Sequence, residues 1–141
     1  MSRQKQAGFS LIEMLIGLTI LAVGILAVVT MQVTSLRNNA LSFSRTEAAS
    51  VGQGMVEDLM ARAFNDPLLQ DTNGDGAGGL AETGNNADFS TALTVNNIAY
   101  QLSWNISTND PVQNTLTLGL IVQWPYAGVQ RTLTLTQIIG R

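Results

Sequence analysis

The chain has 141 residues and a mass of 15.0 kDa, which suits one domain with a modest core. Seven basic residues against ten acidic ones give a net charge of -3, so no direct nucleic-acid binding by bulk electrostatics is expected. The absence of Cys and His from the sequence removes thiol catalysis, zinc–thiolate sites, disulfides and the most common general base. Acid chemistry on paired carboxylates and binding of a hard cation such as Ca²⁺ remain open.

The first predicted element is an apolar helix over residues 9–31, long enough at about 34 Å to span a bilayer. Residues 1–8 before it are polar and basic, and the positive-inside rule predicts a single-pass anchor with the N-terminus in the cytoplasm and the C-terminus exported. Glu13 lies four residues into the apolar run, where a carboxylate in mid-bilayer costs about 2.5–3.5 kcal/mol. Glu13 either has a function in the membrane or snorkels to the interface. A secretory signal cut near residues 22–24 is a competing interpretation that Glu13 argues against.

The residues Gly8-Phe9-Ser10-Leu11-Ile12-Glu13 resemble the prepilin signature of type IV pilins and type II secretion pseudopilins. The resemblance implies that residues 1–8 are a leader peptide and that a prepilin peptidase cuts after Gly8 and methylates the new amino terminus of Phe9. It also gives Glu13 an assembly role, because the Phe9 amine of a neighbouring subunit can supply the cation that a buried carboxylate needs.

Helical spacing continues over residues 32–66 as an amphipathic segment, and Pro67 with the preceding Asn65 and Asp66 predicts its end. The expected fold is α+β, the type IV pilin fold, in which one long helix has its first half in the membrane or filament core. Its second half is expected to pack on a small antiparallel sheet.

A Gly- and Asp-rich loop is expected over residues 67–97, and it contains the calcium-loop pattern D-x-[DN]-x-[DN]-G-x5-E. Alternate side chains in this pattern converge on one cation, and Gly76 permits the sharp turn. The candidate ligands are Asp71, Asn73, Asp75, Ala77 (by its carbonyl) and Glu82. The flanks do not match an EF-hand, so the alternatives are one weak calcium site and an acidic loop that binds nothing.

From Ile98 to the C-terminus the apolar period changes to two, which predicts three antiparallel strands over residues 98–141, with a short fourth strand over residues 92–95. One face is expected to cover the helix and the Thr-rich face to meet solvent or a neighbouring subunit. Tyr100, Trp104 and Trp124 are expected in the core rather than in a ligand site. The last hairpin also resembles PilV-type minor pilins in its Trp124, its Gly128 turn and its Arg-Thr-Leu-Thr strand.

These features favour a non-enzymatic minor pilin that is anchored in the inner membrane and then enters an extracellular pilus. The resemblance implies prepilin peptidase, major and other minor pilins and an inner-membrane assembly platform as partners, with adhesion and twitching motility as the associated functions. A type II secretion pseudopilin is the alternative that shares every N-terminal feature. A calcium-binding single-span membrane protein that never polymerises is the alternative from another class, and Glu13 discriminates against it. An enzyme with a metal held by the loop carboxylates lacks an accompanying base or nucleophile.

Overall fold

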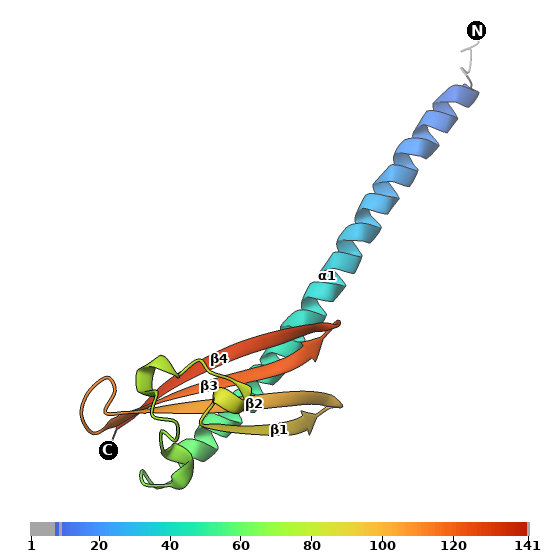
Figure 1. Ribbon diagram of the computed structural model, residues 1–141. Helices are drawn as coiled ribbons and strands as arrows, with labels where there is room; N and C mark the ends of the chain where they lie inside the picture. The colour runs from blue at the N-terminus through green and yellow to red at the C-terminus, as the bar shows by residue number, and fades with distance from the viewer. Residues whose placement is uncertain (1–7, 9, 141) are drawn as a thin grey trace, which may run out of the picture. The chain divides into compact units, whose positions relative to one another are not determined.

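The computed structural model describes Gly8 and residues 10–140, in two compact units, Met1–Ala40 and Leu41–Arg141. Helix α1 (Leu11–Met60) runs through the boundary between the units. After it come three 3₁₀ turns and four strands (Figure 1). The turns are η1 (Pro67–Leu69), η2 (Gly76–Gly78) and η3 (Gly84–Asn86), and the strands are β1 (Phe89–Val95), β2 (Ile98–Thr108), β3 (Thr115–Tyr126) and β4 (Val129–Gly140).

The first unit, as far as it is described, is the part of α1 up to Ala40. Leu, Ile, Met and Ala dominate its sequence and favour the helix, whereas Gly17 and Gly24 each weaken it by about 1 kcal/mol relative to Ala. Every side chain from residue 11 to residue 40 is exposed, so packing within the chain does not stabilise this helix.

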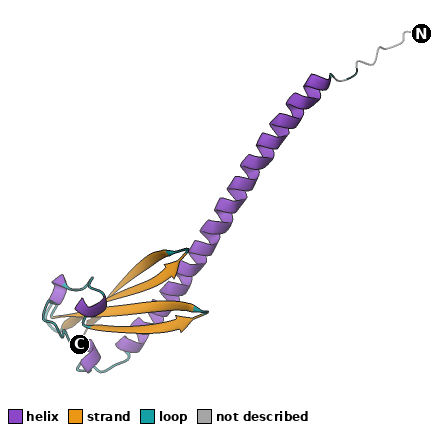
Figure 2. Cartoon of the chain, turned by 45° about the vertical axis from the view of Figure 1, so that its right-hand side comes forward, coloured by secondary structure: helices purple, strands orange, loops and turns teal. Residues whose placement is uncertain are grey.

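The second unit packs residues 41–60 of α1 on one face of an antiparallel sheet with the strand order β1-β2-β3-β4 (Figure 2). Contacts from three positions of the helix fix this packing. The indole Nε1 of Trp124 donates to Ser44 Oγ at 3.4 Å, and the Tyr100 hydroxyl donates to Glu47 Oε2 at 3.0 Å. Gly52 lies so close to the sheet that a Cβ there would be 2.8 Å from Leu135 Cδ1.

The core is formed by alternate residues of β2 and β3, as the period of two predicts. Its buried members from the strands are Tyr100, Leu102, Trp104, Ile106, Leu116, Leu118, Leu120, Val122 and Trp124. The expectation that Tyr100, Trp104 and Trp124 belong to the core is confirmed, because each is at most 4% exposed. The α+β class with one long helix on a small antiparallel sheet is likewise confirmed.

The helix ends earlier than residue 66. Its last residue is Met60, just after Leu59 makes the final core contact. The following residues form tight turns in which Asp66 N donates to Ala63 O, and the Asp66 carboxylate then caps η1 by accepting from Leu68 N at 2.9 Å. Arg62 ties the turn together with ion pairs to Asp58 and Asp66.

The first strand begins earlier than expected, so the predicted loop over residues 67–97 was too long. Strand β1 starts at Phe89 rather than residue 92, because the Phe89 ring stacks on Trp104 with centroids 5.4 Å apart. Thr91 interrupts the apolar side of this strand, and the polar residue hides the period of two from a reading of the sequence.

The second face of the sheet is covered over β2 and β3, which corrects the expectation that it meets solvent. Ser103, Asn105 and Ser107 on this face are buried, because the segment of residues 76–88 crosses it. Gly119 allows the close approach, since a Cβ there would lie 2.3 Å from the Leu80 carbonyl oxygen. The even-numbered residues of β1 and β4 remain exposed on this face, among them Ser90, Thr94, Thr132, Thr134 and Thr136.

Candidate functional site

The apolar part of α1 is the first candidate site. One 18-residue window of this helix has a mean hydropathy of 2.6 and no buried residue, so by length and composition the helix can cross a membrane. Large hydrophobic side chains such as Leu11 (83% exposed) and Ile20 (68%) project from it. An exposed apolar surface of this length needs lipid or other apolar helices around it.

The hydroxyl groups on this helix are satisfied within it. Thr19 Oγ1 donates to the Ile16 carbonyl at 2.8 Å, and Thr30 Oγ1 donates to the Ala27 carbonyl at 2.8 Å. Such bonds to the preceding turn leave no hydroxyl proton that needs water. The Thr residues are therefore compatible with a surrounding of hydrocarbon.

Glu13 is the exposed acidic residue of the first turn of α1. Gly17 lies one turn further on, and its lack of a side chain leaves a shallow depression beside Glu13 that Met14, Leu18 and Leu21 also line. A neighbouring chain can approach the backbone closely at such a position. The geometry therefore offers a carboxylate and an open contact surface on the same part of the helix.

The processing residues lie at the edge of the described chain. Gly8 is exposed and precedes the helix. Phe9, the residue predicted to carry the methylated amine, and residues 1–7 of the leader lie outside the described residues.

The candidate calcium loop is ordered by its own hydrogen bonds. Both carboxylate oxygens of Asp71 accept backbone N–H groups, Oδ1 from Gly74 at 2.7 Å and Oδ2 from Gly76 at 3.1 Å. The amide of Asn73 donates to the Asp75 carboxylate and to the Asn86 carbonyl.

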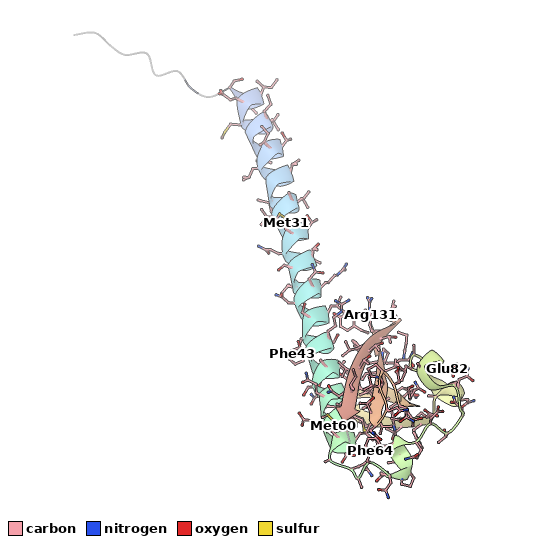
Figure 3. All side chains as sticks on the ribbon, turned by 90° about the vertical axis from the view of Figure 1, so that its left-hand side faces the viewer. Met31, Phe43, Met60, Phe64, Glu82 and Arg131 are labelled. Carbon is pink, nitrogen blue, oxygen red and sulfur yellow. The ribbon has the colours of Figure 1, made fainter. Side chains whose placement is uncertain are left out.

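The acidic members of the predicted ligand set do not cluster in the structure. Within residues 10–140, no three acidic side chains gather closely enough to hold a metal ion, so Asp71, Asp75 and Glu82 do not form one shell. Ala77 lies in η2. Glu82, labelled in Figure 3, accepts a hydrogen bond from Asn105 Nδ2 through its main-chain carbonyl at 2.9 Å. The oxygen donors suit a hard cation by type, and a weak calcium site in this loop stays a prediction.

Sequence reasoning missed the residue that holds the loop in place, Asp88. Its Oδ1 accepts from Thr72 N at 2.6 Å, Thr72 Oγ1 at 2.9 Å and Asn73 N at 3.2 Å, and its Oδ2 accepts from Ile106 N at 2.8 Å. The Asp88 amide donates to Asn105 Oδ1. One carboxylate therefore joins the loop to β2, which is the role that the sequence pattern had assigned to a cation. The sequence signal that could have indicated this role is the position of Asp88, an acidic residue directly before strand β1.

On the helix-covered face of the sheet, the Glu47 carboxylate also accepts hydrogen bonds. Glu47 on α1 accepts from the Tyr100 hydroxyl and from Asn96 Nδ2. Burial of Tyr100, followed by its hydrogen bond to Glu47 and the negative charge there, raises the pKa of the phenol to about 12. Tyr100 therefore stays a neutral donor, which anchors the helix to the sheet.

Comparison with known families matches residues 3–29 to the model described as the prokaryotic N-terminal methylation motif. This motif supports a type IV pilin-like protein. The matched residues contain Gly8, Phe9 and Glu13 and most of the apolar part of α1. No curated protein and no solved structure matches the chain. The motif implies processing by a prepilin peptidase and assembly with other pilins, and it is consistent with membrane anchoring before assembly.

Proposed function

We propose that this chain is a minor pilin subunit of a bacterial type IV pilus. The observation that carries the proposal is the methylation motif over residues 3–29, which includes most of the apolar part of α1, where every side chain from residue 11 to residue 40 is exposed. A prepilin peptidase cuts after Gly8 and methylates Phe9 while the helix holds the chain in the inner membrane, with its N-terminus in the cytoplasm and its C-terminus outside. The inner-membrane platform then moves the subunit among major and other minor pilins into the filament.

Glu13 is the assembly residue in this proposal. Its cost in hydrocarbon, about 2.5–3.5 kcal/mol, is offset when the Phe9 amine of the adjacent subunit pairs with it. The depression at Gly17 gives the adjacent helix room to come close. The chain acts as a structural protein, and we propose no enzymatic activity for it.

A pseudopilin of a type II secretion system is the second candidate, since the methylation motif supports both classes. The terminal hairpin favours the pilus, because Trp124, the Gly128 turn and the strand from Arg131 resemble PilV-type minor pilins. Adhesion and twitching motility would follow from the pilus assignment. Deletion of the gene in the native host separates the two: loss of pili supports the minor pilin, and loss of protein secretion with intact pili supports the pseudopilin.

The filament role is tested with Glu13→Ala in the native host. We expect normal amounts of cleaved protein in the membrane and loss of the protein from sheared filaments, because the variant keeps the anchor and lacks the carboxylate. Ser10→Ala is the matched control, since Ser10 is a polar, exposed residue beside the same end of α1. Equal incorporation of Glu13→Ala and the control would support a single-span membrane protein that does not polymerise.

A further inference from the structure

The sheet has two open edges of unlike length. Strand β1 (Phe89–Val95) has seven residues and β4 (Val129–Gly140) has twelve, and each is hydrogen-bonded on one side only. Exposed edge strands usually carry charges, prolines or bulges that prevent pairing with another chain. Strand β1 has no charged residue and no proline, and β4 carries Arg131 as its single charge.

The outward hydrogen-bonding groups of both edges follow from their hairpins. Each hairpin has a two-residue turn with positive φ at both positions, Asn96-Asn97 and Ala127-Gly128. The residues that flank such a turn exchange hydrogen bonds with each other, and bonded and non-bonded pairs then alternate along the strands. The backbone groups that point away from the sheet therefore belong to the even-numbered residues of both edges: Ser90, Ala92, Thr94, Thr132, Thr134 and Thr136.

The direction of the strands decides which edges can join. A β4–β4 pair has its twofold axis normal to the sheet, so the helical segments 41–60 of the two copies would run in opposite directions. In a sheet of four antiparallel strands, β1 and β4 run in opposite directions. A second copy with the same orientation therefore presents its β1 antiparallel to β4. A filament that repeats one contact between copies needs this common direction.

Three registers place every residue of β1 opposite a β4 residue of the same face, and in the middle one Thr134 lies opposite Ala92 of the second copy. On the outer face, Thr132 and Thr136 then meet Thr94 and Ser90. On the helix face, Leu133 and Leu135 meet Leu93 and Thr91.

Charge complementarity supports the same register. Arg131 lies at the start of β4 (Figure 3), and its Nε is buried and has no hydrogen-bond partner among the described residues. In this register Arg131 lies opposite Val95 of the second copy, beside Asn96. Asn96 donates to the Glu47 carboxylate, and the ion pairs found in the described part of the chain leave Glu47 without a cation. Neighbouring strands are about 4.8 Å apart, so the long Arg131 side chain would approach the turn whose Asn96 holds the Glu47 carboxylate.

We propose that a second copy of this chain adds its β1 to the β4 edge, so that the sheet continues from one subunit to the next and Arg131 pairs with Glu47 of the added copy. The contact uses different surfaces on the two partners, so it can repeat along a filament. The inference rests on the proposed role as a filament subunit and names a contact between the heads of such subunits.

The sequence has no cysteine, so paired cysteine variants test this contact directly. One tagged copy carries Ala92→Cys, a second copy with another tag carries Thr134→Cys, and both full-length chains are expressed together in the native host. In the proposed register the two Cα atoms are about 5.5 Å apart, within disulfide range. Mild oxidation of membranes and sheared filaments should give a mixed dimer, and neither variant alone should give a dimer.

Thr136→Cys with Ala92→Cys is the matched control. It keeps the face and exposure but moves the partner two residues along the strand, to about 9 Å, beyond disulfide reach. Equal yields from the control pair would contradict the register. Dimers from Thr134→Cys alone would indicate β4–β4 pairing and overturn the proposal, as would the absence of the mixed dimer from both fractions.

The charge pair is tested in the same assay with Arg131→Gln on the Thr134→Cys copy. We expect the yield of mixed dimer to fall about fivefold, as loss of one partly screened ion pair implies. An unchanged yield would remove Arg131 from the contact. Mass spectrometry of the N-terminal peptide in these samples distinguishes failure of the strand pairing from failure of the proposed filament role. Cleaved protein in filaments without the cross-link contradicts only the strand pairing, whereas uncleaved protein contradicts the filament role itself.

Discussion

Replacing Asp88 by Ala should destabilise the second unit substantially. The carboxylate accepts four hydrogen bonds, and the one from Ile106 N comes from a residue that is 0% exposed. A hydrogen bond to a charged group contributes about 1.5–3 kcal/mol when its loss leaves a buried donor unpaired. Water can replace Asp88 at the exposed groups of Thr72 and Asn73, so these bonds add about 1 kcal/mol together. We therefore expect a loss of about 3 kcal/mol in the free energy of unfolding.

Urea unfolding of the full chain in detergent, followed by tryptophan fluorescence, measures this loss because Trp104 and Trp124 are both buried. Asp75→Ala is the matched control, since its exposed carboxylate accepts only a side-chain amide hydrogen bond from the neighbouring Asn73. The control should lose less than about 0.5 kcal/mol. If Asp88→Ala unfolds at the same urea concentration as the control, a single carboxylate does not tether the loop to β2.

Three further predictions concern the same unit. Gly119→Ala should lower the unfolding free energy by about 2 kcal/mol in urea titrations, because the new Cβ meets a backbone carbonyl at 2.3 Å. Gly54→Ala, in open space on the helix, should raise the unfolding free energy by about 1 kcal/mol, and equal effects would refute the packing argument. The pKa of Tyr100 is about 12 in the folded protein and 10.0 for a free phenol, so the fold favours the neutral phenol. This contribution to stability is fully present below pH 10. Stability should therefore fall by about 2 kcal/mol between pH 10 and pH 12, and Tyr100→Phe should abolish this fall. For the loop, the sequence pattern predicts that millimolar Ca²⁺ raises the thermal midpoint and that Asp71→Ala removes the rise. An unchanged midpoint would leave Asp88 as the organiser of the loop.

The fold was predictable where one periodic pattern dominates. The apolar run and the continued helical spacing predicted α1, and the period of two predicted β2, β3 and β4, because alternate strand residues are apolar where they face the helix. The end of the helix was less predictable. Met60 is set by the last core contact of Leu59 and by the turn that Arg62 and Asp66 stabilise, and these are tertiary effects.

The covered second face of the sheet was not predictable from spacing. Gly119 and Asn105 have their roles only because residues 76–88 cross the sheet, and no local pattern encodes that crossing. For the same reason the pattern of Asp71, Asp75 and Glu82 suggested a cation, whereas the structure uses Asp88 to hold the loop. The N-terminal helix was predictable from local sequence, because the methylation motif and the apolar segment are both runs of contiguous residues.

The most direct test of the proposed function is mass spectrometry of the N-terminal peptide of the protein from membranes and sheared filaments of its native host. The account predicts a peptide that begins at N-methylated Phe9 in both fractions. A peptide that begins at Met1, or one that begins beyond Gly24, would contradict processing as a prepilin and with it the assignment to a filament.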